Sequence, residues 1–101
     1  MRYKLEFNEQ ALKEWGKLNS TIKEQFKKKL KQILENPKIP KNRLRGYENI
    51  YKIKLRQSGF RLAYKVIDNR LVVYVVAVGK RDKNKIYNLL RQRSTKDFGS
   101  R

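Results

Sequence analysis

The fold is decided by residues 51–66, YKIKLRQSGFRLAYKV, in which apolar and cationic side chains alternate along two runs. Alternation with period two is typical of a β-strand that buries one face. The pair Ser58-Gly59 separates the runs and predicts a two-residue hairpin turn. Because a slip of one residue would bury the cations, the turn and the alternation together predict an antiparallel hairpin with one shared apolar face.

The other face of this hairpin is cationic. The predicted turn places Arg56 opposite Arg61 and Lys52 opposite Lys65, with Lys54 on the same face. Like charges that are opposed across a hairpin repel one another. We therefore expect this face to bind an anion, and a phosphate backbone is the anion that best matches a row of cations.

The composition indicates a nucleic-acid partner. The chain has 101 residues, enough for one domain with a modest core, and its 27 basic residues against nine acidic ones give a net charge of +18. Such a chain binds polyanions even without specificity, with an affinity that falls as salt is added. An anionic membrane surface fits less well, because no basic amphipathic helix with a broad apolar face is evident. A nucleic acid or the ribosome is the expected partner.

The absence of two residue types limits the chemistry. The chain contains neither Cys nor His. It therefore has no disulfide, no thiolate ligand for a metal and no imidazole for proton transfer near neutral pH. We expect a cytoplasmic protein without metal or cofactor, in which any catalysis relies on Lys, Arg, Tyr or a carboxylate. No apolar run approaches the roughly 20 residues of a membrane span, and the first residues lack a signal-peptide core.

The N-terminal part predicts a strand followed by two helices. Residues 2–7 alternate as a short strand, and Asn8 can cap a first helix. Thr21 and Glu24 have the spacing of a capping box for a second helix, which Pro37 would end. The two helices predict an αα-hairpin packed on one side of the sheet.

The C-terminal part predicts the rest of a small, mainly antiparallel sheet. Residues 71–78 are apolar on both faces, as in a covered central strand, and Gly79 would end that strand. Apolar positions within residues 86–90 predict a short C-terminal helix. The chain is thus predicted to be one α+β domain, residues 1–93, followed by a disordered tail at residues 94–101.

Five short motifs follow one another along the chain. Each motif alone is weak, but their order and spacing together are specific. The motifs are ALKEW at residues 11–15, NRLRG at 42–46, YKIKLR at 51–56, SGFRL at 58–62 and VGKR at 78–81. Together they resemble the RelE family, the ribosome-dependent mRNA endonuclease toxins of bacterial toxin–antitoxin pairs, over about residues 1–90.

The resemblance implies a toxin that enters the ribosomal A site and cuts the mRNA codon. In such a toxin a ribose 2′-hydroxyl attacks the adjacent phosphate, without a metal. The resemblance also implies an acidic, RelB-like antitoxin that wraps the toxin, and a repressor complex through which alone operator DNA is bound. The residues that the family uses correspond here to Lys52, Lys54, Arg61, Arg81 and Tyr87.

These residue types suit that reaction. The attack requires removal of a proton from the nucleophile, stabilisation of the phosphorane charge and protonation of the leaving 5′-oxygen. Lys52 or Lys54 would be the base, since neighbouring cations lower the pKa of a lysine, and the other would stabilise charge. Arg61 would clamp the phosphate with its planar fork. Arg81 would stabilise the leaving oxygen or donate a proton to it through a water. Tyr87 would stack on a base.

Further basic residues are candidates for binding RNA outside the catalytic set. The resemblance makes Arg45 a supporting contact, while Arg56 and Lys65 lie on the predicted cationic side of the hairpin. A basic run on the second helix is either a solvated surface or a contact to 16S rRNA phosphates, which would position the protein without reading sequence. Its candidate residues are Lys27, Lys28 and Lys31.

Two other functions stay open at this point. Without the resemblance, the cationic hairpin fits a non-catalytic basic module that binds RNA or the ribosome. A gyrase-directed toxin could also use a similar scaffold, although it would not need this set of Lys, Arg and Tyr side chains. Messages cut inside codons would indicate the nuclease, DNA damage the gyrase-directed toxin, and unaffected growth the binding module.

Overall fold

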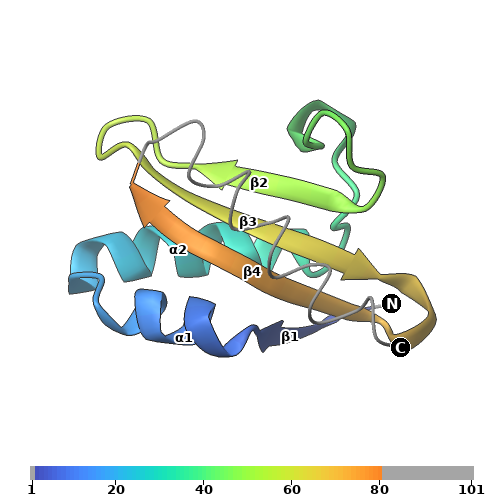
Figure 1. Cartoon of the computed structure of the whole chain (residues 1–101), viewed down its shortest axis with the longest axis horizontal. Coiled ribbons are helices and arrows are strands. Elements are labelled where there is room, and N and C mark those ends of the chain that lie inside the picture. Colours follow the sequence, from blue (N-terminus) through green and yellow to red (C-terminus); the bar gives the residue numbers. More distant parts are fainter. Residues whose placement is uncertain (1, 81–101) are drawn as a thin grey trace.

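A computed structural model describes residues 2–80 as a four-stranded sheet with two helices on one face (Figure 1). The strand order is β1-β4-β3-β2, in which β1 is parallel to β4 and the other neighbours are antiparallel. The predicted α+β class with a mainly antiparallel sheet is confirmed. The elements are β1 (Lys4–Phe7), α1 (Glu9–Gly16), α2 (Ser20–Ile33), η1 (Pro40–Asn42), β2 (Ile50–Lys54), β3 (Phe60–Ile67), η2 (Asp68–Arg70) and β4 (Val72–Lys80).

An asparagine side chain starts each of the two helices. Asn8 accepts hydrogen bonds from two backbone N–H groups of the first turn of α1, at 2.8 and 3.2 Å, as predicted. Asn19 accepts a hydrogen bond from the N–H of Ile22 at 2.9 Å and caps α2. The predicted capping box at Thr21 is therefore wrong, because Asn19 supplies the cap two residues earlier and places Thr21 inside the first turn.

The apolar stripes of both helices pack on the same face of the sheet (Figure 1). Phe26 and Leu30 of α2 are buried in one cluster with Leu62 of β3. Trp15 of α1 joins this cluster, with its ring centroid 6.1 Å from that of Phe26 and 5.5 Å from that of Phe7. Because burial of one such side chain contributes roughly 1.5–3 kcal/mol, this cluster is the main stabilising element of the fold.

The β2–β3 hairpin has a longer loop than predicted. Lys54 pairs with Arg61, and the N–H of Leu55 donates to the carbonyl of Phe60 at 2.9 Å, which leaves four residues in the loop. Gly59 has a φ of 79°, a conformation that glycine adopts at little cost. The predicted two-residue turn is wrong. The register differs from the prediction by two residues, so each strand side chain still keeps its predicted face.

Strand β4 extends beyond its predicted end. Gly79 pairs with Arg61 and Lys80 pairs with Phe60, so the prediction that Gly79 ends the strand is wrong. Pairing with β3 continues because Gly79 has no positive φ that would turn the chain. β4 lies between β1 and β3, and most of its side chains are buried, as expected for a covered central strand.

A smaller apolar cluster occupies part of the opposite sheet face. The bend before β2 supports it, since the N–H of Leu44 donates to the carbonyl of Ile50 at 2.8 Å. This cluster leaves the rest of that face to cations. Its buried members are Leu44, Ile50, Ala63, Val76 and Ala77, with Tyr47 and Tyr74 partly buried against them.

Several predictions concern residues 81–101, which lie outside the described part of the chain. They are the roles of Arg81 and Tyr87, the C-terminal helix and the tail. In the part that the structure describes, no helix combines the length and the apolar character that crossing a membrane requires.

Candidate nucleic-acid-binding and catalytic site

The cations of β2 and β3 lie on the sheet face that is opposite the helices. Pairing sets Lys54 directly against Arg61 and places Lys52 on the same face, since opposed side chains and every second residue point to one side. Lys65 pairs with Ile50, so the predicted opposition of Lys52 and Lys65 is wrong. The four-residue loop causes this change, because it slides β3 by two residues along β2. We call Lys52, Lys54, Arg61 and Lys65 the cationic face.

Arg61 has the environment of a phosphate clamp. Its cross-strand neighbours are Lys54 on β2 and Gly79 on β4, and Gly79 has no side chain to compete for the guanidinium. The Nε of Arg61 is buried and has no hydrogen-bond partner among the described residues. A buried donor without a partner is costly. A phosphate oxygen would satisfy it with a charge-assisted hydrogen bond.

Burial lowers the pKa of Lys65, because an ammonium group loses favourable hydration when it leaves water. Lys65 lies four residues from Arg61 along β3, which is about 13 Å at the usual rise of a strand. This separation fits a contact to a different nucleotide from the one held by Lys54 and Arg61.

Two adjoining cavities open at the edge strand β2, between this strand and α2. The larger, of about 500 Å³, is lined by Lys54 and Arg56 from the hairpin and by Lys28 from α2. The smaller, of about 400 Å³, extends to Lys52 and η1. We call the two cavities the basic cleft. The residues that line both of them are Lys29, Gln32, Lys54 and Arg56.

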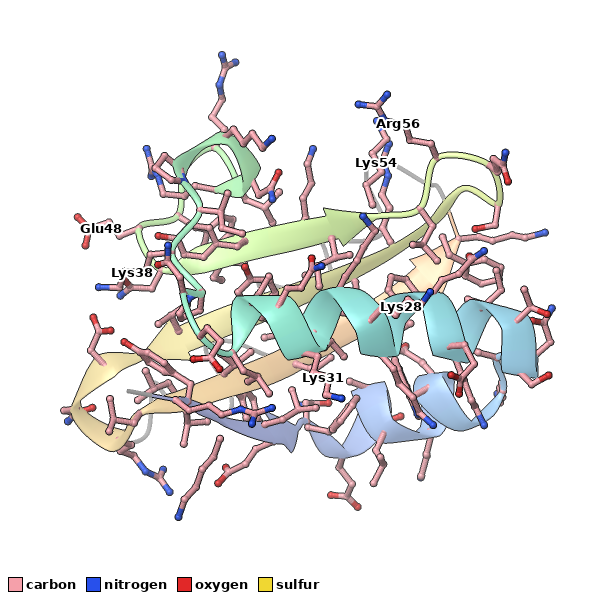
Figure 2. All side chains as sticks on the ribbon, turned by 180° about the vertical axis from the view of Figure 1, so that it is seen from behind. Lys28, Lys31, Lys38, Glu48, Lys54 and Arg56 are labelled. Carbon is pink, nitrogen blue, oxygen red and sulfur yellow. The ribbon has the colours of Figure 1, made fainter. Side chains whose placement is uncertain are left out.

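The electrostatics of the basic cleft favour a polyanion. In the described part of the chain, no acidic side chain lines either cavity. Figure 2 shows Lys54 and Arg56 projecting in the same direction at the end of β2, with Glu48 at the far end of that strand. Lys52 and Lys54 belong both to the cationic face and to the cleft. One polyanion could therefore contact both surfaces.

Two predicted RNA-binding residues lie away from the cationic face. Arg56 is in the hairpin loop and not in a strand, so its predicted pairing with Arg61 is wrong; it lines the basic cleft instead. Arg45 is exposed in the bend before β2 and lines neither cavity. Since β2 begins beside this bend and ends at Lys54, Arg45 lies toward the other end of the strand.

The lysines of α2 divide between two sides of the helix. Lys28 lines the basic cleft, whereas Lys27 and Lys31 do not. The Nζ of Lys27 lies 3.6 Å from a carboxylate oxygen of Glu24. Figure 2 shows Lys31 on the side of α2 that faces α1. The predicted basic run is thus not one continuous surface.

Sequence reasoning missed part of the cleft. The missed residues are Gln25 and Gln32 of α2 and Gln57 of the hairpin loop. A signal for the helical residues was present, because they recur with Lys28 at helical spacing beside the apolar stripe. No comparable signal marks the loop residue, since its position depends on how the hairpin closes against α2.

The described site offers ammonium, guanidinium and amide groups. These groups can neutralise phosphates, stabilise the charge of a pentacoordinate phosphorus and, for lysine, transfer a proton. Within residues 2–80, no group of three or more acidic side chains is placed to hold a metal ion.

Comparison with protein families identifies one matching family model. The model, described as the ParE toxin of the type II toxin–antitoxin system parDE, matches residues 5–85. The chain is also 57% identical over 88 residues to the mRNA interferase toxin RelE of Escherichia coli strain K12. That match covers 87% of this chain and 93% of the relative.

Solved structures share the fold. The structure of free E. coli toxin RelE with two arginine-to-alanine substitutions has a TM-score of 0.86 and 54% identity, and the match covers 92% of this chain and 98% of that chain. A chain of the intact E. coli RelBE toxin–antitoxin complex has a TM-score of 0.77 and 59% identity, with 79% and 98% covered.

Proposed function

The chain belongs to the ParE toxin family of type II toxin–antitoxin systems, among its RelE-like members, and on this basis we propose that it is an mRNA endoribonuclease toxin. It acts in the ribosomal A site and cuts the codon through attack of a ribose 2′-hydroxyl on the adjacent phosphate. The similar E. coli protein is named an mRNA interferase toxin, which supports the reaction class.

The direct opposition of Lys54 and Arg61 is the observation that carries this proposal. It places an amine and a guanidinium on one face, together with a buried Arg61 Nε that lacks a protein partner among the described residues. Arg61 would neutralise the charge of a phosphodiester bound there. The 2′-hydroxyl of the adjacent ribose would then lie near Lys54. Orientation of this kind can supply about 7–11 kcal/mol of the barrier.

The reaction forms a bond between the 2′-oxygen and phosphorus and breaks the bond from phosphorus to the 5′-oxygen. Lys52 or Lys54 accepts the proton of the 2′-hydroxyl, and the other lysine stabilises the phosphorane with Arg61. Arg81 stabilises the leaving 5′-oxygen or donates a proton to it through a water, and Tyr87 stacks on a base. The products are a 2′,3′-cyclic phosphate and a 5′-hydroxyl end.

Outer contacts position the RNA. Lys65 is supported by its place on the cationic face, and Arg56 by its place in the basic cleft. Arg45 is a more distant contact beside the start of β2. On α2, Lys28 contacts an RNA phosphate in the basic cleft, and Lys27 and Lys31 contact phosphates of 16S rRNA.

The proposed partners follow from the membership of the chain among the RelE-like toxins. Ribosome and mRNA are bound by the toxin in the cytoplasm. A cognate acidic antitoxin neutralises it, which is supported by the similarity to a toxin solved in the RelBE complex. Operator DNA is bound only through the toxin–antitoxin complex, which represses its own promoter.

A gyrase-directed toxin on a similar scaffold is the second candidate, since the matching family model describes a toxin of a type II toxin–antitoxin system and not a nuclease. The 57% identity to an mRNA interferase favours the ribonuclease over it. The non-catalytic basic module is a third reading of the cationic face. Expression in cells separates the three functions. The ribonuclease leaves messages cut inside codons, the gyrase-directed toxin damages DNA, and the binding module leaves growth unaffected.

The test uses purified protein on ribosomes programmed with a defined message, followed by mapping of the cleaved ends. The wild-type protein should cut within the A-site codon and leave 2′,3′-cyclic phosphate ends. Lys52→Ala, Lys54→Ala, Arg61→Ala and Arg81→Ala should each reduce the rate by about 10²–10⁴-fold.

The matched control is Lys13→Ala, which removes one cation from the exposed surface of α1, far from β2 in sequence and on the helix side of the sheet. It should cut like the wild type. Wild-type rates in all four site variants would contradict the proposal, as would absence of cleavage by the wild type on programmed ribosomes.

A further inference from the structure

One side of α2 carries a polar stripe that faces the hairpin. Gln25, Lys28, Lys29 and Gln32 follow one another at helical spacing, and all four line the larger cavity of the basic cleft. The apolar stripe of the same helix, which includes Phe26 and Leu30, is buried in the core. The polar stripe therefore has a fixed orientation, because the buried stripe locks the rotation of the helix.

The opposite wall of the cavity comes from the hairpin. Lys54, Arg56 and Gln57 line it at the point where β2 ends and the loop begins. Lys54 is also the residue that pairs with Arg61 on the cationic face. The cavity therefore begins at the proposed scissile site and leads around the edge of the sheet toward α2.

We propose that this cavity binds the single-stranded RNA that continues from the scissile linkage, with Lys28 and Lys29 on its phosphates and the glutamine amides on its riboses and bases. The inference rests on the proposed function, because the cleaved strand is taken to lie on the cationic face. Lys54 joins the two surfaces, so the same strand reaches the cavity without crossing any other element. The cavity thus adds an mRNA-binding subsite to the toxin.

The lining favours RNA over an acidic peptide. Three glutamine amides offer donors and acceptors, and four cations offer charge, whereas Leu55 is the one apolar residue that lines the larger cavity in the described part of the chain. An amphipathic peptide gains most of its affinity from apolar anchors. A ribonucleotide strand instead offers phosphates, hydroxyls and base edges, which match amides and ammonium groups.

The test measures binding of a fluorescent uridine oligonucleotide of roughly 12 nucleotides, within the range of single-strand site sizes, to the full chain at several salt concentrations. The double variant Lys28→Gln and Lys29→Gln removes both ammonium groups but keeps residues of similar helix propensity. Its salt slope should fall by about 1.4, since each phosphate contact on a single strand contributes about 0.7. At 0.1 M salt this corresponds to roughly 25-fold weaker binding.

The matched control is the double variant Lys13→Gln and Lys17→Gln, which removes the same charge from exposed positions on and just after α1. It should keep the wild-type slope. A second probe, a uridine trinucleotide, is too short to fill both surfaces, so the difference between wild type and the α2 variant should shrink. Equal losses in the two double variants would overturn the inference and leave only a diffuse positive surface.

Two further results would overturn it in favour of another occupant. Loss of affinity for ribosomes with unchanged affinity for the oligonucleotide would indicate ribosomal RNA. Loss of affinity for a polyglutamate peptide with unchanged affinity for the oligonucleotide would indicate an acidic partner. Cleavage on programmed ribosomes separates the two claims: the α2 variant should show a higher KM with an unchanged kcat. If the wild type fails to cleave while the oligonucleotide results hold, the proposed function fails and the subsite stands.

Discussion

Lys54 and Arg61 are directly opposed across the β2–β3 hairpin, on the sheet face opposite α1 and α2. Two cations in this relationship raise the free energy of the folded protein when no anion is bound. A phosphate between them would remove that cost. The pair therefore links stability to ligand binding at the proposed site.

Lys54→Gln should make the free protein more stable and less active. Removal of one of two opposed cations should raise the free energy of unfolding by about 0.2–1 kcal/mol at low salt. Urea unfolding at low and high salt measures this, and the gain should shrink as salt screens the repulsion. A stability that is unchanged at low salt would show that the pair does not repel.

Gly59→Ala should destabilise the hairpin. Gly59 has a φ of 79°, where a side chain costs roughly 1–2 kcal/mol. Gly16→Ala is the matched control: a Cβ there meets nothing within 4 Å, and alanine is the better helix former by up to about 1 kcal/mol. Chemical denaturation of both variants should therefore give shifts of opposite sign.

Glu14 of α1 makes a hydrogen bond to the C-terminal part of β4. Its Oε1 accepts a hydrogen bond from the N–H of Val78 at 3.0 Å, beyond the point where β1 stops pairing with β4. Glu14→Ala should lower the free energy of unfolding by about 1–3 kcal/mol, because it leaves a buried amide without its acceptor. Glu14→Gln keeps an acceptor oxygen and should lose less. The rate of amide hydrogen exchange at Val78 should rise more in the alanine variant than in the glutamine variant. Equal losses of unfolding free energy in the two variants would argue against this bond.

Asp68 should make the stability depend on acid pH. Hydrogen bonds from Lys38 and from the hydroxyl of Tyr3 hold the pKa of its carboxyl below the usual value of 3.8. The folded state therefore favours the ionised form, so this contribution is present above the ordinary pKa and is lost as the pH falls through the lowered one. Urea midpoints between about pH 6 and pH 2 should fall less steeply in Asp68→Asn than in the wild type. Parallel curves would contradict this.

Local pattern was sufficient for the strands and for the orientation of their side chains. The alternation in residues 51–66 predicted that Leu62 would be buried and that Arg61 would face the other way, and the structure agrees. A register error of two residues left this unchanged, since strand side chains repeat with period two. The cap of α2 was misassigned to Thr21, because the capping-box spacing of Thr21 and Glu24 was weighted above Asn19, although asparagine is the stronger N-cap residue.

The sequence by itself determined that Lys52, Lys54, Arg61 and Lys65 share one sheet face, because that depends only on alternation along each strand. Only the tertiary structure decided that Lys54 faces Arg61, that Arg56 leaves this face, and that Lys28 lies across a cavity from both Lys54 and Arg56. The first two of these depend on the length of the hairpin loop, which sets the register and leaves Arg56 outside the strand. The third depends on how α2 packs against the edge of the sheet, which is set by contacts between residues far apart in the chain.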